Sequence, residues 1–561
     1  MNTAFFIALR RLRFPIIALI CSYAISVTGL VLIEGVDGNG NPAPMSWFHA
    51  FYFMSYTATT IGFGEIPYAF NDLQRMWVIF CIYLSVVNWA WLLAAIMSLA
   101  QDRSFLSAMK RGTFSRQVQR MREPFWLMCG YGQTGALLCD SLGHSGQRVV
   151  VLEKREHEIF ELELHDHGIS IPSLLADARD AEILMAAGLS HSELAGVLAL
   201  TSDDATNLGI AAAARVLNPY VPVYCRSETP SVAESALAFG TDMLINPFKV
   251  FTDELRLLLV NPQAHTLFTR LTPTHGTGRL SNRDCPEGQW IICGYGRFGK
   301  LVVDALSETG RPCTPIDPTL LNLSAKDIDG IWQDELDELR DAHLPYAAGI
   351  VVATGDDTRN LALVALARQV NPDIYVILRQ NDDHSALLFQ ALKPDMLMVP
   401  SVMVARQCLA AMTSTMLPQL QDYLATMPVP IVSHLLESLP DAQTHVWEVC
   451  LNFNETPALF NYFCQQKQIR LSDLLRDNRQ RDERLAIHAV ALLRAGKFMV
   501  DFDEETLILQ ANDRLLMAGT ASLHYRLDLT LRDERVLTYV LDGIDRPDGW
   551  FFRWLAERNR G

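Results

Sequence analysis

The sequence of 561 residues lacks any clustering of cysteine and lacks an excess of positive charge. Its eleven cysteines are scattered, with no C-x-x-C pair and no spacing typical of a zinc site. This pattern argues against a cysteine-based metal cluster and is typical of reduced, cytosolic thiols. The formal net charge of −16 argues against a nucleic-acid partner, because nucleic-acid binding needs a basic face.

Two stretches lack charge altogether. Residues 14–33 and 76–100 contain no Asp, Glu, Lys or Arg, and each has the roughly 20 apolar residues that a helix needs to cross a bilayer. The first stretch has no A-x-A cleavage site, so we interpret it as a span rather than a signal peptide. The sequence therefore predicts a membrane protein with two spans.

Basic residues are nearly absent between the two spans, where Arg75 is the one example. Arginines at positions 10, 11 and 13 precede the first span, and six Lys or Arg residues lie at positions 103–122 after the second. The positive-inside rule then places both termini in the cytoplasm. Neither span carries an arginine at every third position, so a voltage-sensor helix is not expected, and opening must be controlled elsewhere.

The segment between the spans is apolar where a polar loop is expected. Residues 46–58 read SWFHAFYFMSYTA, which predicts a helix that dips back into the membrane. The residues that follow, Thr60, Ile61, Gly62, Phe63 and Gly64, resemble the potassium-channel signature TVGYG. Glycines suit such a segment because alternate residues need a positive φ. The alternative interpretation is a glycine turn in an ordinary hairpin.

This resemblance implies a selectivity filter made by four chains around one axis. Backbone carbonyls of four residues would coordinate K⁺: Thr60, Ile61, Gly62 and Phe63. Phe63 departs from the signature because it lacks the tyrosine hydroxyl that buttresses the filter in many members. Glu65 keeps a carboxylate at the outer mouth. Asn88, the one amide of the second span, is expected beside the central cavity, with an interhelical hydrogen bond as the alternative.

The remainder of the chain contains an internal duplication. Residues 125–143 align with 289–307, residues 198–226 with 350–379, and residues 239–247 with 392–400. In the second pair, the matched residues Asn207 and Asn360, and Arg226 and Arg379, are 153 positions apart. Repeats of this length indicate two copies of one structural unit. Each copy alternates strand-like and helix-like segments, which predicts a parallel sheet with helices on both faces.

Each copy carries a G-x-G-x-x-G motif between a buried strand and a helix. The glycines are Gly130, Gly132 and Gly135 in the first copy and Gly294, Gly296 and Gly299 in the second. Such a turn brings backbone N–H groups and a helix N-terminus to a pyrophosphate. An acid follows 23 residues after the first glycine in both copies: Glu153 and Asp317. Both acids favour NAD(H) or an adenine nucleotide such as ADP or ATP over NADP.

These repeats resemble RCK domains, which regulate potassium conductance and are related to TrkA subunits. The resemblance implies further nucleotide contacts, each of which could instead be a turn, a helix cap or a surface residue. The candidates are Tyr131, Gln133, Thr134, Asp177, Thr201, Asp203 and Arg226 in the first copy, and Arg297, Phe298, Thr354, Asp356 and Arg379 in the second. Ca²⁺ is a second candidate effector, although the sequence shows no compact ligand loop for it.

The expected fold is a helical two-span pore domain followed by two α/β Rossmann-like RCK domains and a small α+β C-terminal lobe. The expected boundaries are 1–100 for the pore domain (pore helix and filter 46–65), 101–124 for a linker helix, 125–275 and 288–416 for the two Rossmann domains, and 417–561 for the lobe and tail. Aromatic residues at 550–554 suggest that this tail packs on another surface.

The sequence as a whole predicts a ligand-gated potassium channel, not an enzyme, in the bacterial inner membrane. Four chains would form a homotetramer with a ring of eight RCK domains. Two alternatives remain open. A membrane-anchored dehydrogenase would need a proton-transfer constellation that the sequence does not show, and a regulatory subunit or nucleotide sensor of a separate potassium transporter would not need its own filter.

Overall fold

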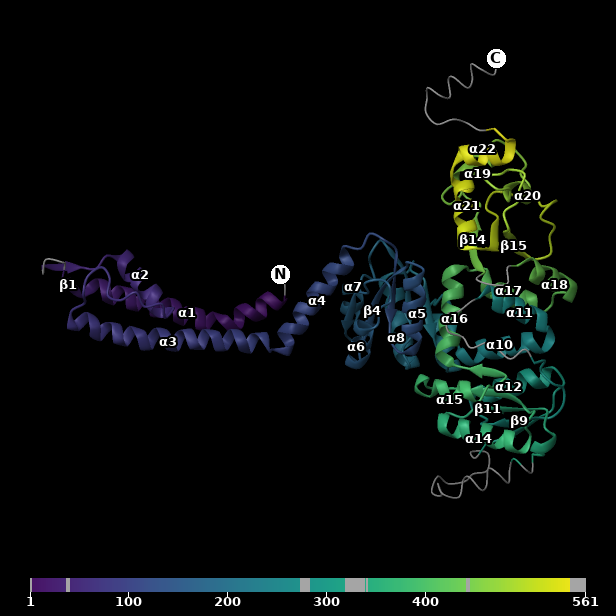
Figure 1. The fold of residues 1–561 in the computed structure, drawn as a ribbon, viewed down its shortest axis with the longest axis horizontal. Coiled ribbons are helices and arrows are strands. Elements are labelled where there is room, and N and C mark those ends of the chain that lie inside the picture. Colours follow the sequence, from purple (N-terminus) through teal and green to yellow (C-terminus); the bar gives the residue numbers. More distant parts are fainter. Residues whose placement is uncertain are drawn as a thin grey trace, which may run out of the picture. The chain divides into compact units, whose positions relative to one another are not determined.

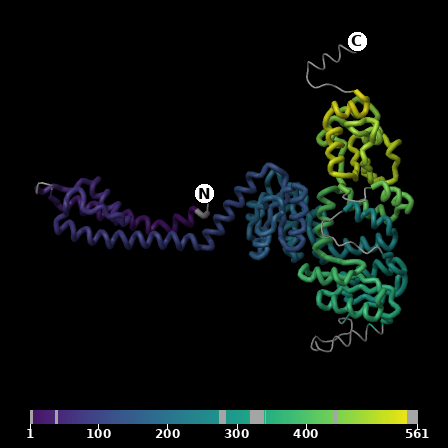
Figure 2. Tube along the Cα trace, viewed as in Figure 1, coloured from purple at the N-terminus to yellow at the C-terminus, as the bar shows by residue number. Residues whose placement is uncertain are grey.

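The computed structural model describes residues 3–36, 41–272, 283–317, 339, 342–439 and 444–544. The chain divides into two compact units (Figures 1 and 2). The first comprises Met1–Glu123 with the short segments Pro172–Leu174 and Glu182–Glu193, and the second comprises the remaining residues.

The first unit is built on two long helices that lie side by side (Figure 1): α1 (Thr3–Leu32) and α3 (Asp72–Ala100). Both are long and apolar enough to cross a membrane. They begin before the predicted positions 14 and 76, because the helices continue through the polar residues at their first turns. Between them lie a short hairpin, β1 (Glu34–Val36) and β2 (Pro42–Pro44), and the predicted short helix α2 (Trp47–Ala58). Helix α4 (Arg103–Gln119) follows α3.

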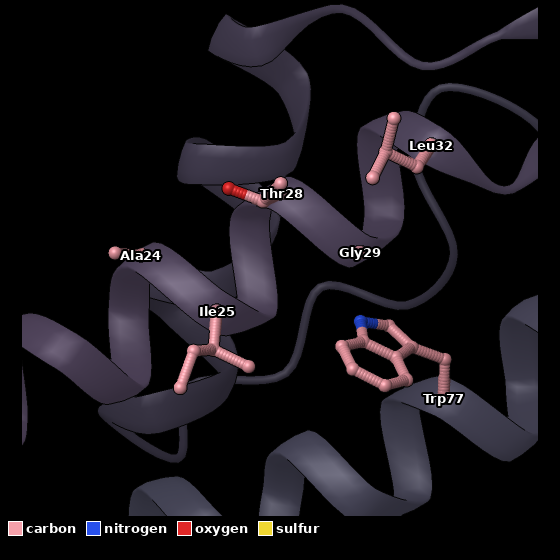
Figure 3. A pocket seen from close by; sticks show the side chains of 6 residues that line it. All are labelled: Ala24, Ile25, Thr28, Gly29, Leu32 and Trp77. Atoms are coloured by element: carbon pink, nitrogen blue, oxygen red, sulfur yellow. The ribbon is translucent and has the colours of Figure 1, made fainter.

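A close contact between Trp77 and Gly29 fixes how α1 and α3 pack. The indole lies directly over Gly29 (Figure 3), and a Cβ at that position would overlap the ring. The indole Nε1 donates to the carbonyl of Ser26 at 3.2 Å. An apolar pocket of about 410 Å³ remains beside this contact, lined by Ala24, Ile25, Thr28, Gly29, Leu32 and Trp77. The glycine is thus required for close helix packing.

The first repeat forms a six-stranded parallel sheet with the order β5-β4-β3-β6-β7-β8, which is the doubly wound order of dinucleotide-binding folds. Every residue of β3 is buried, as expected for a strand covered on both faces. The elements are β3 (Phe125–Cys129), α5 (Gln133–His144), β4 (Arg148–Glu153), α6 (Glu156–Leu164), β5 (Ser173–Leu175), α7 (Ala181–Ala186), β6 (Leu194–Ala199), α8 (Asp204–Leu217), β7 (Val223–Arg226), α9 (Pro230–Ala238) and β8 (Met243–Ile245).

The second repeat has the same topology with five strands in its described residues, in the order β10-β9-β11-β12-β13. Pro312 and Pro315 do not prevent pairing, because β10 still runs parallel to β9 over four residue pairs. The elements are β9 (Trp290–Cys293), α12 (Arg297–Glu308), β10 (Cys313–Ile316), η2 (Leu344–Tyr346), β11 (Gly349–Val352), α14 (Asp357–Val370), β12 (Tyr375–Arg379), η3 (Asp383–Ser385), α15 (Ala386–Ala391) and β13 (Met396–Met398).

Each repeat continues into helices that pack between the two sheets and the C-terminal lobe: α10 (Pro247–Val260), α11 (Pro262–Leu271), α16 (Pro400–Thr413), α17 (Leu417–Leu424) and α18 (Val429–Ser438). The lobe itself has an antiparallel sheet of order β14-β17-β15-β16. Its elements are β14 (His445–Cys450), α19 (Pro457–Cys464), α20 (Leu471–Leu474), β15 (His488–Arg494), β16 (Lys497–Met499), β17 (Arg514–Gly519), α21 (Ala521–Arg532) and α22 (Glu534–Asp542). The predicted fold class, two apolar helices followed by Rossmann-like domains, is confirmed.

The C-terminal lobe includes the helices α21 and α22, and their Leu531 and Leu537 are buried in its core. The aromatic residues at 550–554, which were expected to pack on another surface, lie outside the described residues.

A buried ion pair joins the helices that follow the two repeats. Arg406 of α16 pairs with Glu254 of α10, and their side chains are 10% and 6% exposed. Removing one partner of such a pair leaves an uncompensated buried charge, so we expect Arg406→Leu to lower the free energy of unfolding by about 3–5 kcal/mol. Denaturant unfolding followed by tryptophan fluorescence would measure this change.

The matched control is the double variant Glu254→Leu/Arg406→Leu, which removes both charges. A buried pair replaced by apolar residues of similar volume is often neutral in stability. The double variant should therefore recover most of the stability that Arg406→Leu loses. Equal losses in the single and double variants would contradict this account of the pair.

Candidate functional site

The segment from Thr60 to Gly64 has an alternating backbone. Thr60, Gly62 and Gly64 have φ values of +64°, +67° and +92°, all in the left-handed region. The sequence predicted this conformation at the glycines because they have no Cβ. The structure extends it to Thr60, a β-branched residue for which a positive φ is unfavourable. A left-handed residue at every second position is the backbone alternation that the predicted filter requires.

The side chain of Glu65, at the end of this segment, is held by hydrogen bonds. Its carboxylate accepts hydrogen bonds from Arg75 Nε at 2.9 Å and Nη2 at 3.2 Å, and from the backbone N–H of Phe70 at 2.8 Å. The bidentate pair connects the end of the filter segment to the first turn of α3. The predicted position of Glu65 therefore has a structural use in addition to its charge.

Asn88 gains no support for a position beside a central cavity. It is 8% exposed within this single chain, and its amide donates to the carbonyl of Leu84 at 2.8 Å, four residues earlier in α3. Within the chain, the amide therefore donates to its own helix. Its cavity role stays a prediction.

The three glycines of the first motif have distinct steric surroundings. A Cβ at Gly130, whose φ is +104°, would lie 3.0 Å from the backbone of Thr201, and a Cβ at Gly135 would lie 2.7 Å from the carbonyl oxygen of Gly130. Gly132 is open, since its Cβ would meet only Arg155, at 3.4 Å. The first and third glycines therefore allow close packing, and the second leaves space for a ligand at the start of α5.

The second motif repeats these features. Gly294 has φ +99° and lies against Ala353, a Cβ at Gly299 would overlap the carbonyl of Gly294, and a Cβ at Gly296 would meet nothing within 4 Å. Gly132 and Gly296 are the N-cap residues of α5 and α12, and neither helix has a side-chain cap. Backbone N–H groups at both helix starts are thus available to an anion, so both motifs fit a nucleotide phosphate.

The acids that follow the two glycine motifs, Glu153 and Asp317, occupy equivalent places. Glu153 accepts from the N–H of Tyr131 at 2.7 Å, and Asp317 accepts from the N–H of Tyr295 at 2.6 Å. Glu153 also accepts from the N–H groups of Lys154 and Arg155, both at 2.8 Å, and it is only 6% exposed. In the first copy the carboxylate therefore stabilises the glycine loop, with little capacity left for a ligand.

Asp177 lies at the same sheet edge as Glu153, because the N–H of Ala176 donates to the Glu153 carbonyl at 2.8 Å. The guanidinium of Arg179, 2.6 Å away, holds the pKa of Asp177 well below its usual range, with Lys154 contributing at 3.4 Å. The carboxylate is thus ionised and already paired at a position where the sequence predicted a nucleotide contact.

The two copies share a T-[SG]-D-D-x-x-N sequence, at residues 201–207 and 354–360, and each begins a helix. Asp203 is the N-cap of α8 and accepts from the N–H of Thr206, and Asp356 is the N-cap of α14 and accepts from Thr358 and Arg359. Thr201 and Thr354 donate through their hydroxyls to Asn207, at 2.7 Å, and Asn360, at 2.5 Å, respectively. These residues lie near the glycine loops, but their side chains are used in the local turn, as the helix-cap interpretation anticipated.

Two predicted nucleotide contacts are buried instead. Phe298 is 0% exposed and packs against Phe248 and Phe251 of α10, with ring centroids 5.7 Å and 5.4 Å apart. Thr134 is 2% exposed. Both side chains lie on the face of their helix that packs into the core, and nucleotide contacts at these two positions stay predictions.

The predicted arginines contact protein groups. Glu228 accepts from Arg226 at 2.6 Å and forms an ion pair with Arg297 of the second copy at 3.0 Å. Arg379 lies over the ring of Phe248 at 4.9 Å, and burial lowers its pKa. Gln133, in turn, donates to Asp382 of the second copy at 3.0 Å. Three of these residues therefore connect the two copies, which the sequence did not anticipate.

Three residues that contact the predicted sites were not identified from the sequence. Tyr56 of α2 donates to the carbonyl of Gly64, and Arg155 lies beside Gly132. His167 donates through Nδ1 to the Asp140 carboxylate at 2.5 Å, and its Nε2 forms a hydrogen bond with the Tyr131 hydroxyl at 3.0 Å. Only Arg155 had a signal in the sequence, its position two residues after Glu153. Among the described residues, no group of three or more His, Cys, Asp or Glu could hold a metal ion, so the Ca²⁺ prediction is unsupported.

Two family models match the chain. Residues 17–102 match the family described as ion channel, and residues 126–247 and 290–400 match the TrkA-N domain. The resemblance to a two-span channel with tandem RCK domains is thereby confirmed. The matched ranges contain the filter segment and both glycine motifs.

Two named relatives each match less than half of this chain. Potassium channel protein 1 of Methanocaldococcus jannaschii is 24% identical over 45% of this chain and 71% of its own length. Voltage-gated potassium channel Kch of Escherichia coli K12 is 26% identical over 43% of this chain, which spans only 58% of that relative. The solved structure described as GsuK channel bound to NAD is 16% identical, covers 94% of this chain and 99% of its own, and has a TM-score of 0.44.

Proposed function

From an ion-channel domain joined to two TrkA-N domains, we propose that this chain is the subunit of a nucleotide-gated potassium channel. The observation that carries the proposal is the left-handed backbone at Thr60, Gly62 and Gly64, between two helices able to cross a membrane. Such a segment makes a conduction path only when several copies surround one axis. We therefore propose a homotetramer in the bacterial inner membrane, with both termini and eight RCK domains in the cytoplasm.

NAD(H) or an adenine nucleotide of the ADP or ATP type is the proposed effector. The open Gly132 and Gly296 positions and the uncapped starts of α5 and α12 support phosphate binding in both copies. A nucleotide can shift the pore only by as much as it prefers one arrangement of the domains over another. Contacts between the copies, such as that of Arg297 with Glu228, are where such a preference can arise.

The test is ion flux into liposomes that contain the purified full-length chain. Potassium and sodium fluxes would be compared with and without NAD⁺, NADH, ADP, ATP and Ca²⁺. We expect potassium-selective flux that one nucleotide changes. A folded, homogeneous oligomer that passes no ion under any condition would overturn the channel proposal and favour a regulatory subunit or sensor of a separate transporter.

A further inference from the structure

Tyr56 contacts the filter segment at three places. It lies in the last turn of α2, where its hydroxyl donates to the carbonyl of Gly64 at 2.6 Å. Its backbone carbonyl accepts from the N–H groups of Ile61 at 2.9 Å and Gly62 at 3.4 Å. One residue of the short helix therefore holds both the inner and the outer part of the segment.

The surroundings of Tyr56 keep this contact in place. The residue is 4% exposed, and its ring meets Phe63 and Phe53 edge to face, with centroids 5.4 Å and 5.3 Å apart. Aromatic packing of this kind leaves the phenol little freedom to turn away. The hydrogen bond is thus formed by a pre-positioned hydroxyl in a site largely closed to water, where it competes with few solvent molecules.

The contact matters because the backbone of Gly64 does not by itself fix the orientation of its carbonyl. Gly64 has φ +92°, and with no Cβ it can change conformation at little steric cost. Phe63, the residue before it, has no hydroxyl with which to fix the segment from the side. The carboxylate of Glu65 anchors the chain one residue later, to Arg75 and Phe70, but it does not orient the Gly64 carbonyl.

We propose that Tyr56 is a positioning residue for ion selectivity, whose hydroxyl holds the Gly64 carbonyl and with it the outer end of the filter. The inference rests on the proposed potassium conduction. Discrimination between ions depends on where the carbonyl oxygens stand and how far they can move. Four Tyr56 hydroxyls in a tetramer would therefore restrict the outer filter in the arrangement that K⁺ requires.

The test is Tyr56→Phe, which deletes the hydroxyl and keeps the ring. The matched control is Tyr52→Phe, one turn earlier on α2: Tyr52 is 43% exposed, and no hydrogen bond of its hydroxyl is found among the described residues. We expect the potassium-to-sodium permeability ratio to fall about tenfold or more in Tyr56→Phe, on the scale of one lost hydrogen bond in each of four chains. Tyr52→Phe should keep the parent ratio.

Two further measurements separate this role from a general loss of structure. The nucleotide response of the remaining flux should be unchanged in Tyr56→Phe, because the cytoplasmic domains are not altered. The extra thermal stability that K⁺ gives over Na⁺ should shrink in Tyr56→Phe but not in Tyr52→Phe, and this readout needs no conduction.

An unchanged permeability ratio and an unchanged K⁺-dependent stability in Tyr56→Phe would overturn the inference, even with a working channel. If Tyr52→Phe lost selectivity equally, the effect would belong to the helix rather than to the hydroxyl, and the inference would also fail. A parent protein without potassium flux and without K⁺-dependent stability would instead refute the proposed function.

Discussion

Replacing Gly62 by alanine is expected to abolish potassium flux while leaving the protein folded. Gly62 has φ +67°, and an L-residue in this conformation costs about 1–2 kcal/mol in each chain. The space around it is open, since a Cβ would meet nothing within 4 Å in the chain. The segment can therefore relax toward an ordinary backbone conformation, which would turn carbonyls away from the conduction path. Flux into liposomes measures the loss.

The matched control is Gly146→Ala in the first Rossmann domain. Gly146 has φ +72° and a Cβ there would also meet nothing within 4 Å, so the local backbone penalty is the same. Gly146 follows α5 in a turn and has no part in the pore. The Gly146→Ala protein should lose a similar amount of stability and should still conduct potassium like the parent. A Gly62→Ala protein that conducted like the parent would contradict the filter assignment.

Replacing Gly132 by aspartate is expected to remove the nucleotide response. The position has room for a side chain, and an acid at a helix start favours the helix, so the domain should fold. The new carboxylate would occupy the N-terminus of α5 and repel a phosphate there. We expect nucleotide affinity to fall at least tenfold, which corresponds to about 1.4 kcal/mol. Equilibrium binding of NAD⁺ and ADP would measure the change.

Gly296→Asp tests the second copy in the same way, and comparison of the two variants shows which copy carries the response. Gly135→Ala supplies the contrast: its Cβ would lie 2.7 Å from the Gly130 carbonyl oxygen, so this change should destabilise the domain. Thermal unfolding distinguishes the two effects. Unchanged nucleotide binding in both aspartate variants would show that the glycine motifs have only a structural role.

The sequence was sufficient where a short-range property decides the structure. Uncharged stretches of span length predicted α1 and α3, and the glycine spacing predicted the left-handed backbone at Gly62 and Gly64 and the turns that begin at Gly130 and Gly294. The duplication predicted two sheets of one topology, and both are present. Burial of whole strands and the special conformations of glycine are properties of the residues themselves, which is why they could be predicted without tertiary information.

Tertiary structure alone decided which way the side chains around these motifs point. Phe298 was a candidate nucleotide contact in the sequence, but α10 packs against that side of α12, and the ring lies in the core. Arg297 turns toward Glu228 of the other copy, and Tyr56 reaches the Gly64 carbonyl eight residues along the chain. A motif specifies the backbone of a turn, whereas the partner of each side chain depends on which elements pack beside it. That packing is set by the summed burial of many residues distant in sequence.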